Sequence, residues 1–369
     1  FLKALPRVKP YFPVKCNGSE GVIRLLAELG AGFACTNKAE IARVQSIGVP
    51  ADKVFYSSPC KQIAHIKYAA SRGVRLMAFD NEVELSKVAR SHPHARMLLG
   101  IAADSSPSAH PSMTFGTTLK SCRHLLETAK EQAVEVVGIR YSTWFFFHRG
   151  AEPPGEHLLP IQIAAVMNSA LDLYFPDGCG VEIVATPGRY YVTSAFTFAA
   201  SITAMEEVPV EQPGSDGTWD GGMGLPVCPS PHEPSPCSSP EEEARSISPL
   251  QRPCPDRPLH SSSLRGPPGH AEDRIADGLE LPELQVGDWL VFQDMGAYTI
   301  TTSSLLEGWP QPQVTYAMSR VAWKAIQLFQ GKPPQTEDDR ESICTPLSCG
   351  WETAETLCVT PAFAPASII

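Results

Sequence analysis

The chain has 369 residues, of which 43% are hydrophobic, and it carries a formal net charge of −10. This length and apolar content allow two domains with a sizeable core. The acidic balance argues against a nucleic-acid-binding protein, which normally presents a basic surface to the phosphates. Composition therefore predicts a soluble globular protein with other partners.

The sequence shows no sign of disulfides, metal sites or membrane spans. Its 11 cysteines form no C-x-x-C pair and have no regular spacing, which favours reduced intracellular thiols. The longest apolar run, 195–205, is shorter than the ~20 residues that cross a bilayer. Because the sequence opens at Phe1 rather than Met, we expect a further N-terminal piece, where any targeting signal would lie.

Short β-rich runs alternate with amphipathic helical stretches from residue 11 to about residue 140. This alternation is typical of repeated βα units. The expected strands are 11–16, 32–35, 54–57, 76–79, 97–102 and 134–139.

The helices between these strands have recognisable start and stop residues. Ser19 can cap one helix, which Gly30 would end, and Asn37 with Glu40 forms a capping-box pattern that Asn81 repeats with Glu84. Repetition of this kind suits a doubly wound sheet or a (β/α)8 barrel. The first strand is not followed by G-x-G-x-x-G, which weakens the dinucleotide-binding version of the sheet.

Six segments in chain order carry a family resemblance. They are Lys15-Cys-Asn17, Phe33-Ala-Cys-Thr-Asn-Lys-Ala-Glu40, Pro59-Cys-Lys-Gln-Ile63, Pro187-Gly-Arg-Tyr-Tyr191, Gly287-Asp-Trp289 and Met295-Gly-Ala-Tyr298. Together they resemble the eukaryotic ornithine decarboxylase family, which includes the antizyme inhibitors, and the tail 346–368 is most similar to the inhibitor branch.

The resemblance implies an alanine-racemase-like (β/α)8 barrel followed by a β-rich domain. It also implies that 181–185 is the last strand of the barrel. A complete barrel takes roughly 250 residues, whereas 11–190 offers 180, so we expect an incomplete barrel that lacks the family's Gly-rich phosphate loop around 140–166. The expected domains are a truncated barrel at 1–190 and a β-rich domain at 191–208 and 257–369. Between them, 209–256 is rich in Pro, Gly and Ser and is predicted to be disordered.

Pyridoxal phosphate, the family's cofactor, needs a lysine for its Schiff base and an acid at its ring nitrogen. By resemblance, Lys15 is the cofactor lysine, and Gly188, Arg189 and Tyr298 are vestigial cofactor contacts. Thr186 stands at the family's Glu position, Gly269 and His270 stand at its Cys and Asp positions, and Ala34 replaces a further aspartate. None of these replacements supplies the charge or proton of the original, so we expect no intact catalytic residue and no bound cofactor.

The segment 59–96 resembles the family's antizyme-binding element. Its apolar residues, of which Ile63 is the first, are expected on one face of a helix. Its basic residues are expected to face solvent and to attract an acidic partner. The predicted partner-binding residues are Lys61, Lys67, Arg72, Arg75, Lys87 and Arg90.

The leading hypothesis is a catalytically inactive antizyme inhibitor that raises polyamine synthesis and uptake. We expect it in the cytoplasm, with perinuclear or ER-Golgi vesicle association as the family's alternative, and as a monomer or weak homodimer. An active pyridoxal-phosphate-dependent decarboxylase of ornithine or a related basic amino acid is one alternative. A splice form or gene-model product without function is the other.

Overall fold

The computed structural model describes residues 1–102, 116–141, 159–206, 223–224, 247–249, 258–266, 274–299, 314–319 and 357–358. The chain divides into two compact units that are interleaved along the sequence. One unit holds Phe1–Val8, Trp144–Ile183 and Pro187–Gln311, and the other holds Lys9–Thr143, Val184–Thr186 and Pro312–Ile369.

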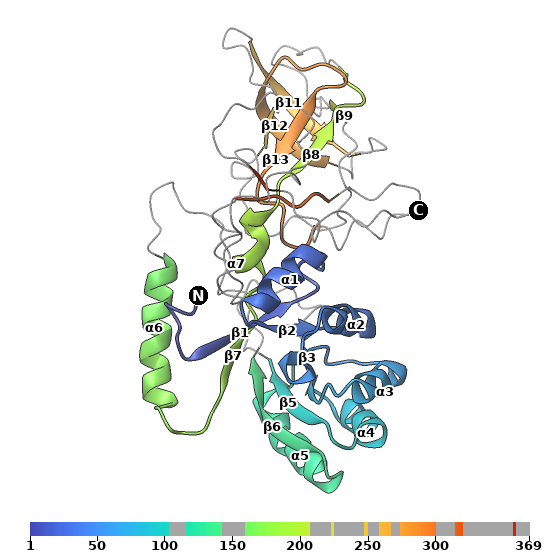
Figure 1. The fold of residues 1–369 in the computed structure, drawn as a ribbon, viewed down its shortest axis with the longest axis vertical. Helices are drawn as coiled ribbons and strands as arrows, with labels where there is room; N and C mark the ends of the chain where they lie inside the picture. The colour runs from blue at the N-terminus through green and yellow to red at the C-terminus, as the bar shows by residue number, and fades with distance from the viewer. Residues whose placement is uncertain are drawn as a thin grey trace, which may run out of the picture. The chain divides into compact units, whose positions relative to one another are not determined.

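A curled seven-stranded sheet organises the unit that contains Lys9–Thr143 (Figure 1). Its strands are β1 (Val8–Pro13), β2 (Gly32–Cys35), β3 (Val54–Tyr56), β4 (Leu76–Phe79), β5 (Arg96–Ile101), β6 (Glu135–Tyr141) and β7 (Ile183–Ala185). The order across the sheet is β6-β5-β4-β3-β2-β1-β7, and neighbours from β1 to β6 run parallel. The sheet is an incomplete barrel, as the sequence predicts, and every expected strand is present within a few residues.

Each of the first five strands is followed along the chain by an α-helix. These helices are α1 (Glu20–Glu28), α2 (Lys38–Ser46), α3 (Ile63–Ser71), α4 (Glu82–Ser91) and α5 (Leu119–Glu131), and the short 3-10 helix η1 (Ala51–Lys53) precedes β3. Helices α2 to α5 pack side by side in chain order over the outer side of the sheet (Figure 1). This succession of parallel strand and covering helix is the barrel pattern that the sequence indicates.

The helix caps agree with the sequence in position and differ in one bond. Asn37 and Asn81 each accept a hydrogen bond from the backbone N–H three residues on, at Glu40 and Glu84. Ser19 occupies the N-cap of α1, but its hydroxyl is buried and makes no capping bond. The Asn17 side chain instead accepts the Ser19 backbone N–H at 3.0 Å.

The inner side of the sheet is closed by an apolar layer of side chains from four neighbouring strands. Tyr11, Ala34, Phe55 and Ala78 form this layer, and all are buried. Gly32 on β2 makes room for the Tyr11 ring, because a Cβ there would lie 2.6 Å from a ring carbon. The sheet therefore has a packed centre, and polar chemistry is left to the strand ends.

The other unit contains most of the β-rich domain. Its helices are α6 (Leu159–Tyr174), α7 (Gly188–Val192) and the 3-10 helix η2 (Thr193–Ala195); its strands are β8 (Phe198–Ser201), β9 (Met223–Gly224), β10 (Ile247–Pro249), β11 (Leu259–Arg265), β12 (Arg274–Pro282) and β13 (Trp289–Phe292). Two three-stranded sheets, ordered β10-β13-β8 and β12-β11-β9, share a core built on Leu264, Leu279, Leu290 and Phe292. The antiparallel pair of β14 (Met318–Ser319) and β15 (Leu357–Cys358) belongs instead to the unit that contains Lys9–Thr143.

Two short stretches of the segment 209–256 form strands, although its composition predicts disorder. Strand β9 pairs with β11, and strand β10 pairs with β13. The rest of the segment lies outside the described residues. The pairing shows that short β segments within it belong to the sheets, while the domain bounds derived from the sequence stay a prediction.

Candidate functional site

Lys15 lies two residues beyond the end of β1 and is exposed. Partial desolvation and the nearby Arg140 guanidinium lower its pKa, while Glu40 and Cys16 oppose this change. Lys15 and Arg140 interact electrostatically, although β2 to β5 separate their strands in the sheet. The curl of the sheet therefore brings both side chains to the same end of the half-barrel, which we call its mouth. A lowered pKa favours the neutral amine that Schiff-base chemistry requires.

Arg140 on β6 is a component of this mouth that sequence reasoning missed. Its Nη1 donates to the Ser57 carbonyl oxygen at 3.2 Å. Burial lowers the pKa of Arg140, and the nearby Asp80 carboxylate opposes that shift. A cavity of about 10 Å³, lined in part by Asp80, Gly116 and Arg140, lies here and is near the lower limit for one water molecule. An arginine directly after the apolar residues at the centre of a strand was the signal that could have identified it.

The acidic groups that a pyridoxal ring would need are absent or engaged at the positions that the structure describes. Thr186 directly follows β7 and is exposed, and it bears no carboxylate. Ala34 is 2% exposed and belongs to the inner apolar layer. The Glu40 carboxylate accepts hydrogen bonds from Thr36 and from the Asn37 side chain. Lys15 therefore fits attachment of the cofactor, whereas Thr186 does not fit protonation of its ring nitrogen.

Gly188, Arg189 and Tyr298 lie in the unit that contains the β-rich domain. Gly188 is the first residue of α7, and the Arg189 guanidinium lies 5.2 Å from the centre of the Tyr298 ring. Gly296 is required by this arrangement, because a Cβ there would overlap the Val192 carbonyl oxygen. Tyr298 has φ of 61°, in the left-handed region that bulky residues rarely adopt. The structure thus brings Arg189 and Tyr298 together, while Gly269 and His270 lie outside the described residues.

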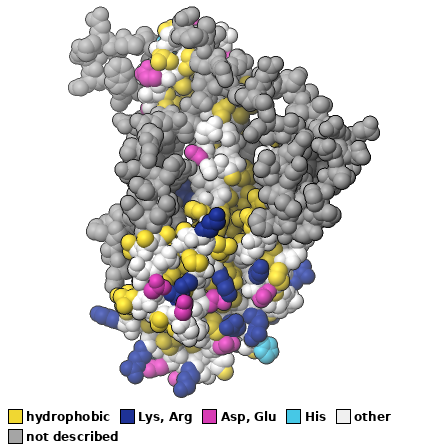
Figure 2. Space-filling model, turned by 60° about the vertical axis from the view of Figure 1, so that its left-hand side comes forward, with side chains coloured by type: hydrophobic (Ala, Val, Ile, Leu, Met, Phe, Trp, Pro, Cys, Tyr) yellow, Lys and Arg dark blue, Asp and Glu magenta, His cyan; other side chains and the backbone are white. Residues whose placement is uncertain are grey.

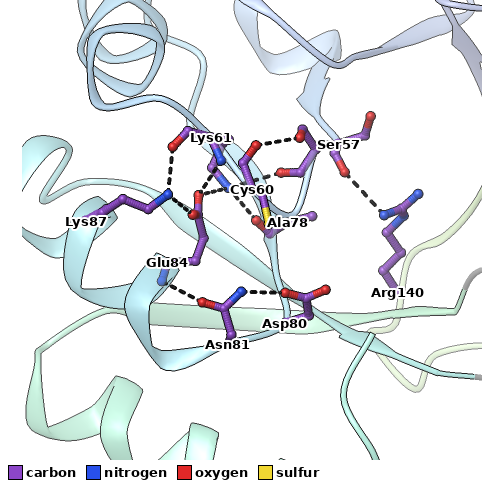
Figure 3. Close-up of polar contacts among 10 residues, drawn as sticks. Ser57, Cys60, Lys61, Ala78, Asp80, Asn81, Glu84, Lys87 and Arg140 are labelled. Carbon is purple, nitrogen blue, oxygen red and sulfur yellow. Dashed lines mark hydrogen bonds and ion pairs between the residues drawn. The ribbon is translucent and has the colours of Figure 1, made fainter. Parts of the chain in front are cut away.

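The predicted solvent exposure of Lys61 is wrong. Lys61 is 3% exposed, and its ammonium forms an ion pair of 2.7 Å with Glu84, which is 1% exposed (Figure 3). Desolvation lowers the pKa of Lys61, and the Glu84 charge opposes this shift. An ammonium this deeply buried requires a paired carboxylate, so Lys61 is an interior residue. Its lysine type alone gave no signal of burial.

The other predicted partner-binding residues lie at the surface of α3, α4 and their connections. Lys67, Arg72, Arg75 and Arg90 are exposed, and Lys87 is partly exposed. Among the residues that the structure describes, the first four form no ion pair. Figure 2 shows Lys and Arg side chains with Asp and Glu side chains between them on the lower part of the face that it presents. We name Lys67, Arg72, Arg75, Lys87 and Arg90 the basic surface.

Ile63 also departs from the predicted helix face. It is 49% exposed, while Ile66 and Ala69 of the same helix are fully buried. Val83, in the first turn of α4, is 70% exposed. Apolar side chains therefore accompany the basic surface.

The described residues contain neither a candidate metal site nor a helix that could cross a membrane. No group of three or more His, Cys, Asp or Glu side chains there could hold a metal ion. None of the helices in that part of the chain combines the length and hydropathy needed to cross a membrane.

Two family models match the chain. Residues 1–142 match the pyridoxal-binding domain of the pyridoxal-dependent decarboxylases, and residues 226–296 match the C-terminal sheet domain of the same proteins. The chain belongs to the pyridoxal-dependent decarboxylase family. The second match begins inside the segment predicted to be disordered, in agreement with the pairing of β10.

Curated relatives extend over nearly the whole chain. Antizyme inhibitor 2 of Mus musculus is 48% identical over 428 residues, an alignment that covers 100% of this chain and 88% of the relative. Ornithine decarboxylase of Mus musculus is 40% identical over 406 residues, with 96% and 85% covered. The first alignment is longer than the 369-residue chain, so this relative contains segments that the chain lacks.

Solved structures share the fold at lower identity. The arginine decarboxylase of Paramecium bursaria Chlorella virus matches with a TM-score of 0.67 and 24% identity, covering 84% of this chain and 89% of that one. The lysine/ornithine decarboxylase of Vibrio vulnificus matches with a TM-score of 0.65 and 22% identity, covering 83% and 85%. The barrel and sheet-domain architecture is therefore that of the family.

Proposed function

We propose that this chain is a catalytically inactive antizyme inhibitor, which binds antizyme and thereby raises polyamine synthesis and uptake. The observation that carries the proposal is the 48% identity to an antizyme inhibitor along the entire chain. The cations of the basic surface support it, since four of the five are exposed and form no ion pair among the residues that the structure describes. They would meet carboxylates of an acidic partner and steer its approach.

The residues at the mouth of the half-barrel support the second part of the proposal, that the chain is catalytically inactive. The cofactor, when bound in an active relative, serves as an electron sink for carbanion charge. In this chain Lys15 supplies an amine, but Thr186 offers no negative charge to hold a ring proton. Losing one oriented electrostatic group can remove ~2.7 to 4 kcal/mol of transition-state stabilisation, so several such losses would leave negligible turnover.

The alternative is a pyridoxal-phosphate-dependent decarboxylase acting on ornithine or a related basic amino acid. The lowered pKa of Lys15 is the observation that favours it. It predicts release of labelled carbon dioxide from ornithine that a Lys15→Met variant loses.

We also propose a cytoplasmic protein that is a monomer or weak homodimer.

Direct binding to purified antizyme tests the proposal. A variant carrying Lys67→Glu, Arg72→Glu and Arg90→Glu is expected to bind at least about tenfold more weakly than the unchanged chain, and the unchanged chain is expected to lose affinity as salt rises. The matched control carries Lys38→Glu, Lys120→Glu and Lys130→Glu, three exposed lysines outside this surface. Absence of binding by the unchanged chain, or equal losses in both variants, would contradict the proposal.

A further inference from the structure

Glu84 collects hydrogen-bond donors from two lysines that belong to different elements. Its carboxylate accepts from the Lys61 backbone N–H at 3.2 Å and from the Lys61 ammonium at 2.7 Å. It also forms an ion pair with the Lys87 ammonium. One buried carboxylate therefore connects the β3–α3 connection with the first and second turns of α4 (Figure 3).

Lys61 is fixed on its other side as well. Its ammonium donates to the Ala78 carbonyl oxygen at 2.6 Å and to the Ser58 carbonyl oxygen at 3.1 Å. It also lies 5.6 Å from the centre of the Tyr56 ring. Together with Glu84, these acceptors engage all three N–H donors of the ammonium. The Lys61–Glu84 pair is therefore held rigidly, and so are the groups that Lys87 contacts.

Lys87 is the member of this cluster that reaches the surface. Its side chain is 22% exposed, against 0% for Lys61 and 1% for Glu84. The Lys87 ammonium also donates to the Lys61 carbonyl oxygen at 2.7 Å. Two fixed acceptors hold it in place, whereas Lys67 is exposed and forms no ion pair in the described part of the chain.

We propose that Glu84 is a positioning residue that holds the Lys87 ammonium at a fixed place on the basic surface, preformed to receive a carboxylate of the bound protein. This inference rests on the proposed function. A lysine that is already ordered loses less conformational entropy when it binds than a free one does. Two ammonium groups around one carboxylate leave a net positive charge, so the cluster still attracts an acidic group.

The variant Glu84→Gln separates positioning from net charge because the two effects have opposite signs. Removing the carboxylate makes the surface more positive, so attraction by net charge alone predicts tighter binding to an acidic partner. Loss of positioning predicts binding weaker by about five- to tenfold. Tighter or unchanged binding overturns the inference.

Combined variants test whether the effect passes through Lys87. In a Lys87→Met background, Glu84→Gln should change the antizyme Kd by less than about twofold, whereas in a Lys67→Met background it should keep its full effect. Equal weakening in both backgrounds would indicate general damage and overturn the inference. Glu84→Gln alone leaves the Lys61 ammonium buried without a countercharge. Lys61→Met combined with Glu84→Gln removes the Glu84 carboxylate without leaving that unpaired charge.

A second readout does not depend on the partner. Amine acetylation of the full chain, followed peptide by peptide, compares Lys87 with the exposed Lys130 of α5. In the unchanged chain we expect Lys87 to react at least about threefold more slowly than Lys130. In Glu84→Gln, and in Lys61→Met combined with Glu84→Gln, the rate of Lys87 should approach that of Lys130. If the unchanged chain binds no antizyme, the proposed function fails; a Lys87 rate that does not respond to Glu84→Gln overturns the positioning by itself.

Discussion

The Lys61 ammonium lies 2.7 Å from the Glu84 carboxylate, and both side chains are excluded from solvent. A buried charge that loses its partner is strongly destabilising, whereas removal of both charges of a pair is much better tolerated. The pair therefore gives the β3–α3 connection and α4 a fixed relative position.

The first prediction concerns the stability that depends on this pair. Glu84→Gln should lower the free energy of unfolding by about 3 to 5 kcal/mol, because it leaves the Lys61 ammonium buried without a countercharge. Lys61→Met combined with Glu84→Gln should recover at least half of that loss. Urea titrations followed by circular dichroism measure both values, and a double variant as unstable as the single one would contradict the role of charge.

The second prediction uses two helix caps that look alike in sequence. Asn37→Ala should destabilise the chain by about 1 kcal/mol, because the Asn37 side chain caps α2 by accepting the Glu40 N–H. Ser19→Ala should change stability by less than about 0.5 kcal/mol, because the Ser19 hydroxyl makes no capping bond. Equal losses, measured by urea unfolding, would show that Ser19 caps α1 in solution.

The third prediction concerns acid stability. His92 is 5% exposed, and burial lowers its pKa from 6.5, although its contact with the Val74 carbonyl oxygen opposes the shift. Below pH 6.5 the unfolded chain binds a proton that folded His92 resists. Stability should therefore fall as pH drops below 6.5, by up to about 1.4 kcal/mol per pH unit from this group until its folded pKa is reached.

The variant His92→Gln isolates this contribution. It should remove part of the loss of stability between pH 6.5 and 5, whereas His260→Gln, at an exposed position in β11, serves as the control. Thermal unfolding at several pH values measures the difference. The same pH dependence in His92→Gln as in the unchanged chain would rule out His92 as its source.

The fourth prediction separates the half-barrel mouth from the basic surface. Lys15→Met should leave antizyme affinity within about twofold of the unchanged chain, because Lys15 lies beyond β1 and is not part of the basic surface. Lys87→Met should weaken binding by about tenfold. Biolayer interferometry with immobilised antizyme compares them. A loss of affinity in Lys15→Met similar to that in Lys87→Met would mean that the mouth takes part in partner binding.

Local sequence patterns predicted the half-barrel well because their physical causes are local. Alternating strands and amphipathic helices gave six strands near their observed positions, and Asn37 and Asn81 cap the helices that they were expected to cap. The short strands β9 and β10 were missed because their residues lie in a segment rich in Pro, Gly and Ser. Their pairing depends on β11 and β13, which lie farther along the chain.

The sequence by itself determined the family, the order of its elements and the replacement of acidic residues such as the one at Thr186, since these depend on residue type and spacing. Only the tertiary structure decided which charges are buried. It places Lys61 in the interior instead of at the surface, and it makes the carboxylate of Glu84, whose backbone N–H Asn81 caps, the countercharge of Lys61. It also brings Arg140 to the same mouth as Lys15. Burial and ion pairing depend on which strands and helices meet after folding, and spacing along the chain does not specify those meetings.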